Sequence, residues 1–302
     1  MTRLFKSASR SQQGILLCCG AYACFSLQDA GMKLLVADYT VTETLFWRSL
    51  AVLLVCLLLG RRALVHEAIK SPARKPLVLR GLVGIAAWIL YYLAAREMSL
   101  AQMTTLYFSA PVIVIVLAVL ILRERPTLLQ WLVVALGFLG VLIACQPTRI
   151  IDPVPVIFAL VSAALWAYTY IMLRQLGGQS SVAGQVAVSN FVFVLATGVT
   201  LPWTLTTSEA IAILFMACVG LIGGIAQYLL FASFAKASAT VLAPFEYTGL
   251  IWAFILSYVV WDASPNLPLL LGAGLIAFSG ILGVVADRRA NQASSSQVDS
   301  IR

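Results

Sequence analysis

The sequence predicts an all-α polytopic membrane protein with ten transmembrane helices arranged as two inverted five-helix repeats. The chain is 61% hydrophobic and only 11% charged, which is too apolar for the surface of a soluble protein of 302 residues. It also contains ten apolar runs of roughly 18–24 residues, each long enough to cross a bilayer as a helix. Finally, its two halves resemble each other at a nearly constant separation.

The ten runs follow one another in order, most of them with short connections. They cover residues 14–35, 43–60, 76–95, 102–122, 127–145, 154–173, 182–203, 210–231, 237–260 and 267–286. The first run resembles a signal peptide, but it lacks a small-x-small cleavage site and nine similar runs follow, which indicates a membrane helix. The basic stretch 61–75 is expected to be the one long loop. Residues 1–13 and the Ser/Gln-rich tail 287–302, which we expect to be disordered, complete the chain.

The basic residues lie mainly on one side of this arrangement. Sixteen of the twenty Lys and Arg residues fall on the side of the N-terminus, and only Arg96 and Arg149 fall in the opposite loops. Such a bias places the basic side in the cytoplasm. We therefore expect a multi-pass protein of the cell inner membrane, with both termini cytoplasmic and an even number of helices.

An internal repeat divides the chain into 14–145 and 154–286. Arg48 stands opposite Asn190 and Ser109 opposite Glu246, and the separation stays between 137 and 142 residues. Each half holds five helices, an odd number, so the second half runs in the inverted sense. Many transporters are built in this way, with the binding site between the halves near the middle of the membrane.

Three segments carry a resemblance to a known family: FWRSL in the second helix, SAPVIVIVLAVLILRERPTLLQW over the fourth and fifth, and APFEYTGLIWAFILSYVVWDASPN over the ninth and tenth. On these segments the sequence resembles the EamA-type group of the drug/metabolite transporter superfamily. Glu124 matches the acidic residue of that family at the end of helix four, whereas Trp261 and Asp262 replace its usual Gly-Glu pair. The resemblance implies a ten-helix basket whose helices 1, 3, 4, 6, 8 and 9 line a central cavity. It also implies that helices 5 and 10 lie outside and mediate association, so a homodimer is expected.

Glu246 is the carboxylate placed deepest in the predicted membrane. It follows Pro244 by two residues in the run 237–260. A bare carboxylate at this depth costs roughly 3 kcal/mol unless it faces a wet cavity or a partner. Glu246 would bind a cation or amine, accept a hydrogen bond from substrate, or carry a coupling proton. The alternative is a structural carboxylate paired with a buried base.

Three more ionisable residues lie within helices, all towards the outer side. Asp29 and Lys33 are four residues apart and hence share a helix face, and Arg48 lies in the next helix. They would form an ion-paired group, acting as an outer gate or as a docking charge for substrate. The alternative is structural neutralisation, with Lys33 reaching to the interface.

Aromatic and amide side chains in the helices expected to line the cavity complete the candidate substrate site. Its members, besides Glu246, are Gln28, Trp88, Tyr92, Tyr107, Trp166, Asn190, Gln227, Tyr228 and Tyr247. Together they would form an apolar slot with a few polar groups, which suits a flat ring with polar edges. The alternative for Tyr and Trp near helix ends is anchoring at the membrane interface.

Two sets of small or cyclic residues shape the predicted helices. Gly220 and Gly223, with other glycines of helices three, five, eight and ten, would allow close helix approach. Pro111 and Pro244 are expected to kink helices four and nine.

The sequence favours a secondary transporter of a small organic metabolite over an enzyme. The single histidine, His66, and six cysteines inside apolar runs form no pattern for a metal, a cofactor or a catalytic triad. No Walker sequence is present, so transport would draw on a gradient. The net charge of +8 indicates cytoplasmic loops at the lipid bilayer, not a nucleic-acid partner. The resemblance favours uptake of a heteroaromatic, riboflavin-like vitamin or S-adenosylmethionine, with export of amino acids or related metabolites as the alternative.

Overall fold

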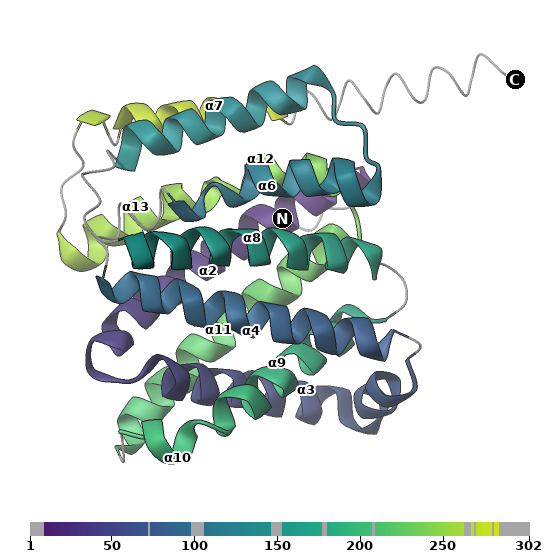
Figure 1. The fold of residues 1–302 in the computed structure, drawn as a ribbon, viewed down its shortest axis with the longest axis vertical. Helices are drawn as coiled ribbons and strands as arrows, with labels where there is room; N and C mark the ends of the chain where they lie inside the picture. Colours follow the sequence, from purple (N-terminus) through teal and green to yellow (C-terminus); the bar gives the residue numbers. More distant parts are fainter. Residues whose placement is uncertain are drawn as a thin grey trace, which may run out of the picture.

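The protein is a bundle of helices that lie across Figure 1 in stacked rows. This computed structural model describes residues 9–71, 73–97, 106–145, 153–176, 180–206, 209–262, 267–268, 270–279 and 281–283. The elements are α2 (Arg10–Asp38), α3 (Val41–Lys70), α4 (Arg74–Glu97), α6 (Ala110–Leu117), the π-helical η1 (Ala118–Leu122), α7 (Leu128–Cys145), α8 (Pro153–Gln175), α9 (Val182–Gly198), α10 (Leu201–Thr204), α11 (Ala210–Phe234), α12 (Ala239–Glu246) and α13 (Thr248–Trp261). A last apolar helix covers Leu270–Gly283. The described residues contain no strand.

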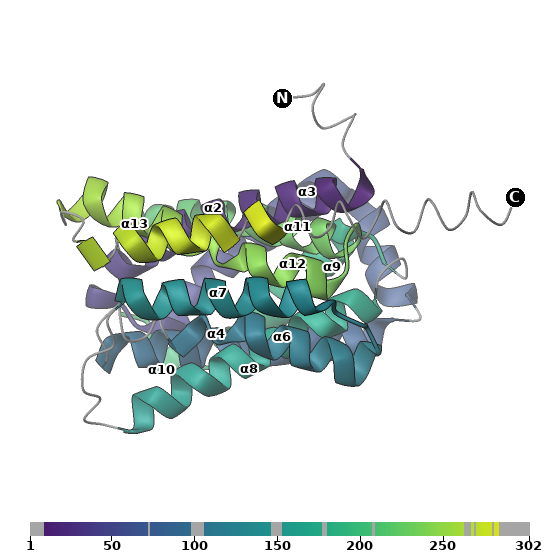
Figure 2. The same cartoon turned by 90° about the horizontal axis from the view of Figure 1, so that it is seen from above.

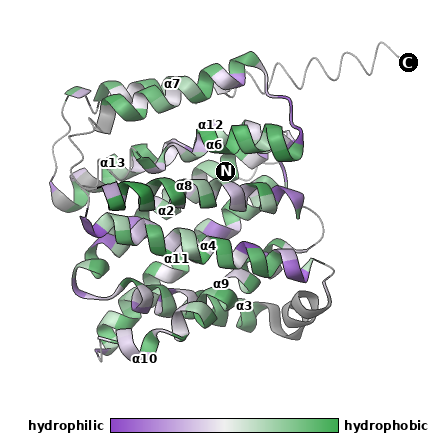
Figure 3. Cartoon of the chain, in the orientation of Figure 1, coloured by the Kyte–Doolittle hydropathy of each residue, from purple (hydrophilic) through white to green (hydrophobic). Residues whose placement is uncertain are grey.

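Within the part of the chain that the structure describes, six helices are long and apolar enough to cross a membrane. They are Arg10–Asp38, Val41–Leu59, Arg74–Glu97, Pro153–Gln175, Ala210–Phe234 and Ala239–Val260. Shorter apolar helices cover Ala110–Leu122, Leu128–Ile143, Val182–Gly198 and Leu270–Gly283. Apolar residues predominate along the helices (Figure 3). Large side chains such as Leu59 and Leu128 are more than three-quarters exposed, as lipid contact requires. The polytopic membrane class is confirmed, whereas ten full spans remain a prediction.

The expected loop over 61–75 is wrong. Helix α3 continues to Lys70, and α4 begins at Arg74. The segment 61–70, RRALVHEAIK, contains strong helix formers and neither glycine nor proline, so nothing in it ends the helix. The predictions for Arg149 and for the tail 287–302 lie outside the described residues.

The ninth predicted helix is interrupted where Pro244 led us to expect a kink. Proline has no backbone N–H to donate, and the helix divides at Tyr247 into α12 and α13. The Thr248 hydroxyl donates to the carbonyl of Phe245 at 2.6 Å and so satisfies one acceptor at the break. Pro111 instead stands in the first turn of α6, where a missing donor costs nothing.

Helices of the two halves pack on each other in matching pairs. Helix α2 lies along α11, as α8 lies along α4, and α3 lies along α9. Helix α13 packs on α2 as α6 packs on α8. Helix α7 and Leu270–Gly283 lie side by side at one edge of the bundle (Figures 1 and 2). Glycines permit the tightest approaches: Gly220 faces the backbone of Arg48, and Gly223 faces the side chain of Gln28.

Candidate functional site

A cavity of about 100 Å³ lies among α2, α4, α8, α13 and residues 107–108, which precede α6. Its walls include Tyr22 and Tyr170, which are buried, and it extends to Lys33, which is exposed. Eleven residues of α2 separate Tyr22 from Lys33, so the cavity follows this helix for about 16 Å. It therefore opens towards the end of the bundle at which α2 finishes, here called the Asp38 end.

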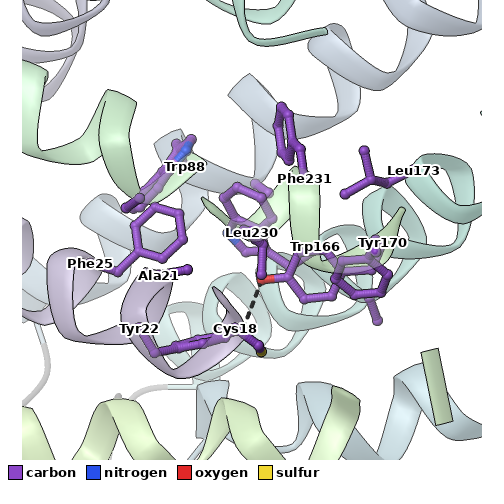
Figure 4. Close-up of a cluster of buried hydrophobic side chains, with 14 of the residues drawn as sticks. Cys18, Ala21, Tyr22, Phe25, Trp88, Trp166, Tyr170, Leu173, Leu230 and Phe231 are labelled. Carbon is purple, nitrogen blue, oxygen red and sulfur yellow. Dashed lines mark hydrogen bonds between the residues drawn. The ribbon is translucent and has the colours of Figure 1, made fainter. Parts of the chain in front are cut away.

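Rings from α2, α4, α8 and the residues just before α6 form the walls of this cavity. The indoles of Trp88 and Trp166 meet edge to face at 5.1 Å, and Tyr91 meets Tyr107 at 5.0 Å. Phe25 lies 6.3 Å from Trp88. Figure 4 shows Phe25, Trp88, Trp166 and Tyr170 converging from α2, α4 and α8. The result is a box of π-faces around a narrow space.

Asp29 supplies the carboxylate of the cavity wall. It is half-buried, and the Tyr92 hydroxyl donates to its Oδ1 at 3.2 Å. Tyr92 in turn stacks on Trp88 at 5.2 Å, with the ring planes 10° apart. The tyrosine therefore holds Asp29 against the aromatic wall.

Arg48 lies behind that wall and does not pair directly with Asp29. Its guanidinium carbon stands 4.5 Å from the centre of the Trp88 ring, on the ring face. Its two terminal nitrogens are buried without a hydrogen-bond partner among the described residues. The structure thus separates the predicted ionic group: Asp29 and Lys33 line the cavity, whereas Arg48 supports Trp88.

Glu246 lies one side chain beyond the cavity. The Tyr22 hydroxyl donates to Glu246 Oε2 at 2.6 Å and lies 3.0 Å from the Tyr170 hydroxyl. Oε1 of Glu246 is buried with no hydrogen-bond partner among the described residues. Both tyrosines line the cavity and Glu246 does not, so the carboxylate acts on the cavity through Tyr22.

A second, smaller cavity of about 10 Å³ adjoins the first. Phe25 and Trp166 line both cavities. The polar side chains of the smaller one include Arg80, Ser189 and Gln227. Gln227 Oε1 accepts a hydrogen bond from Asn190 Nδ2 at 2.9 Å, so Gln227 lines this deeper space and Asn190 holds it from behind.

The bundle is closed at the end where α2 begins, here called the Arg10 end. The Glu124 carboxylate accepts from the backbone N–H of Thr240 at 3.1 Å and pairs with Arg174 at 3.9 Å. Arg174 also donates to the carbonyl of Phe234 at 3.1 Å. Arg10 donates to the carbonyl of Ala235 at 3.1 Å. These bonds join α2, α8, α11 and α12 to one another and to Glu124, which follows η1, and we infer that they close the bundle at this end.

Three further predicted substrate contacts do not line the cavity. Tyr247 is fully buried, with its ring against Gly137 of α7 and 5.8 Å from Phe108, because the helix break turns it away from α2. Tyr228 is 49% exposed and points out of the bundle. Gln28 is buried behind the wall, 3.5 Å from the Tyr92 hydroxyl. Trp88, Tyr107 and Trp166 do line the cavity.

The sequence analysis missed residues that the structure brings into the site. Tyr22, Phe25 and Ser26 share the face of α2 that carries Asp29, and their spacing of three and four residues was the available signal. Arg80 was counted among the basic residues of the cytoplasmic side, but it is 4% exposed inside the bundle. Its place a turn beyond the helix start could have indicated burial.

The sequence matches the model of the EamA-like transporter family over residues 12–145 and again over 154–286. The chain belongs to this family. The two matches coincide with the two halves whose helices pack in corresponding pairs. The protein is accordingly a multi-pass membrane protein of a transporter family.

Several curated relatives are about one-quarter identical to this transporter. An uncharacterized transporter of Helicobacter pylori is 26% identical over 284 residues, covering 89% of this chain and 93% of the relative. The pseudopaline exporter CntI of Pseudomonas aeruginosa is 26% identical and covers 89% and 95%. The S-adenosylmethionine uptake transporter of Rickettsia prowazekii is 26% identical and covers 70% and 72%. A crystal structure with a TM-score of 0.77 and 15% identity covers 92% of this chain and 99% of its own, which supports the fold.

Proposed function

We propose that this protein is a secondary transporter for a small organic cation that carries an aromatic ring, with S-adenosylmethionine as the substrate to test first. The observation that carries the proposal is Asp29 set in a wall of aromatic rings. Aromatic faces attract organic cations, and the attraction strengthens where water is excluded. A carboxylate beside them adds a counter-charge for a sulfonium or ammonium group.

The walls also suit a flat base such as adenine. Trp88 and Trp166 stand nearly perpendicular, at 88°, and therefore offer one face and one edge, the arrangement that aromatic groups prefer. A neutral riboflavin-like ring would use the same faces but would leave Asp29 without a cation. The cavity of about 100 Å³ is smaller than a typical ligand site, so it must widen when substrate enters.

The test compares two ligands that differ by one methyl group and one charge. S-adenosylmethionine carries a sulfonium, and S-adenosylhomocysteine has a neutral thioether. In competition for radiolabelled S-adenosylmethionine uptake into vesicles, we expect the sulfonium compound to compete at least tenfold better, about 1.4 kcal/mol. The Asp29→Asn variant should lose most of this preference, whereas Asp29→Glu should keep part of it.

Tyr228→Phe is the matched control, because this side chain points away from the cavity. It should transport like the parent. If Asp29→Asn is present at the parent level and prefers the sulfonium as strongly as the parent, the cation site is refuted. Absence of S-adenosylmethionine uptake by the parent would reject this substrate.

Export of a metabolite is the second candidate direction. The pseudopaline exporter matches more of this chain than the S-adenosylmethionine uptake transporter does. Labelled substrate is supplied outside right-side-out vesicles and outside everted vesicles. The orientation with the faster initial uptake separates import from export.

We infer the remaining architecture from the same observations. Ten spans in two inverted repeats are supported by the paired packing of corresponding helices. We place the Arg10 end in the cytoplasm of the inner membrane, following the positive-inside bias. Helix α7 and Leu270–Gly283 lie at one edge, which fits the expected homodimer contact. Chemical crosslinking in native membranes tests the dimer, and a purely monomeric product would reject it.

A further inference from the structure

Arg80 is a buried, positively charged side chain that lies outside the proposed binding site for the substrate cation. Its Nη2 donates to Ser189 Oγ at 2.7 Å and to the carbonyl of Gln185 at 3.1 Å. Its guanidinium carbon lies 4.2 Å from the centre of the Phe231 ring. Its Nε is buried without a partner, and no carboxylate of the described residues lies within ion-pair distance. Burying a guanidinium with only neutral partners costs desolvation free energy, so the position of Arg80 calls for an explanation.

The surroundings of Arg80 favour an anionic ligand. Besides the guanidinium, the smaller cavity is lined by the Ser189 hydroxyl and the Gln227 amide, and none of its lining residues is acidic. An arginine fork is well matched to the two oxygens of a carboxylate. The cavity of about 10 Å³ has room for about one water molecule, so a carboxylate enters only when the surrounding side chains move.

Phe25 and Trp166 form the partition between the Asp29 cavity and the Arg80 cavity. Both residues line both spaces, and Figure 4 shows their rings between Tyr22 and Phe231. Asp29 lies on one side, with Lys33 farther along α2 at the exposed end of the same cavity, and Arg80 lies on the other side. A negative group and a positive group on the two sides of the partition match a ligand that carries both charges. An amino-acid group attached to an organic cation has this character.

We propose that Arg80 binds the carboxylate of the transported substrate once Phe25 and Trp166 move apart. This inference rests on the proposed function, because the cation of the same substrate is held at Asp29. The Arg80 cavity would then be the second binding position of the substrate as it moves towards the Arg10 end.

The first experiment measures transport of S-adenosylmethionine and of its decarboxylated analogue, which keeps the sulfonium and the adenosine. We expect the parent to show a KM at least about tenfold lower for the carboxylated compound, as a charge-assisted bidentate contact allows. Arg80→Gln should raise the KM of the carboxylated compound to that of the analogue and leave the analogue within about twofold. Arg80→Lys, which keeps the charge but loses the fork, should fall between them.

Arg48→Gln is the matched control. It removes another buried guanidinium that stacks on an aromatic ring, but Arg48 lines neither cavity. It should change the KM values of both compounds by the same factor. A structural role for Arg80 would give that same result, so equal changes in Arg80→Gln would overturn the proposal.

The second experiment needs no transport substrate. Acetate, the smallest stable carboxylate probe, should raise the Tm of the purified parent and not that of Arg80→Gln, whereas neutral acetamide should raise neither. Equal stabilisation by chloride would overturn the assignment to a carboxylate. If acetate acts through Arg80 but S-adenosylmethionine is not transported, the substrate proposal fails and the carboxylate site stands. If the parent transports both compounds with equal KM and acetate has no effect, the carboxylate site fails alone.

Discussion

Replacing Glu246 by Gln tests whether this buried carboxylate acts on the cavity through Tyr22. The Gln side chain keeps the volume and one acceptor oxygen but removes the charge. The hydrogen bond from Tyr22 is 2.6 Å long, a length typical of an O–H donor to an ionised acceptor. Without the charge, Tyr22 is held less firmly and its contact with the Tyr170 hydroxyl at 3.0 Å weakens.

The magnitude follows from the type of bond that is lost. A hydrogen bond to a charged group contributes about 1.5–3 kcal/mol, which corresponds to a factor of roughly 10 to 150 in rate if it is needed at the limiting step. We expect Glu246→Gln to lower transport at least tenfold at near-normal protein level, because it also removes the charge from a buried carboxylate. Glu246→Asp should be intermediate, since it keeps the charge but its shorter side chain misplaces the carboxylate relative to Tyr22.

A double-mutant cycle with Tyr22→Phe provides the decisive measurement. If Glu246 acts through the Tyr22 hydroxyl, the double variant should transport no more slowly than the slower single variant. Initial uptake rates, normalised to purified protein and checked by Tm, give the three ratios. Tyr168→Phe on α8, a partly exposed tyrosine outside the cavity, is the control. Losses that multiply in the double variant would refute the reasoning and make the two residues independent.

Three further predictions concern packing, closure and topology. Gly223→Ala should lower Tm by several degrees, because the added methyl group would overlap the Gln28 side chain. The control Gly274→Ala should leave Tm unchanged, because its methyl group meets open space. Equal Tm values for the two variants would contradict the close α2–α11 contact. Glu124→Gln should weaken closure of the Arg10 end, so a membrane-impermeant maleimide should label the buried Cys18 several-fold faster in a variant that retains only this cysteine. Unchanged labelling would show that the Glu124 bonds do not keep this end closed. A cysteine placed at Thr148 should react from outside intact cells, and labelling only after permeabilisation would reject the inverted topology.

Periodicity and composition suffice to predict the helices because each helix satisfies its own backbone within lipid. The runs 14–35 and 210–231 differ from α2 and α11 only at their ends. The break after Pro244 is likewise local, since it follows from one missing donor. The prediction of a loop over 61–75 was wrong because the segment is rich in helix formers, and its charges do not prevent a helix.

The site depends on contacts that no local pattern contains. Tyr22 and Glu246 are separated by 224 residues, yet their side chains share a hydrogen bond. Which face of α12 meets α2 depends on how the chain turns at Tyr247, and a rotation of one residue, about 100°, decides whether residue 246 or 247 points inward. The sequence therefore suggested both residues, and only the fold separates them.

The placement of charges gives the two cavities different chemical characters. The larger holds Asp29 and opens towards the Asp38 end, and the smaller holds Arg80 behind the Phe25–Trp166 partition. Neither ionic side chain is neutralised by a direct partner of opposite charge within the described residues. Two unpaired charges of opposite sign, kept apart by two aromatic rings, would attract each other if the rings moved and nothing lay between them. A substrate that bears both charges can pair with Asp29 and with Arg80, so its binding would favour the movement of Phe25 and Trp166 that joins the two cavities.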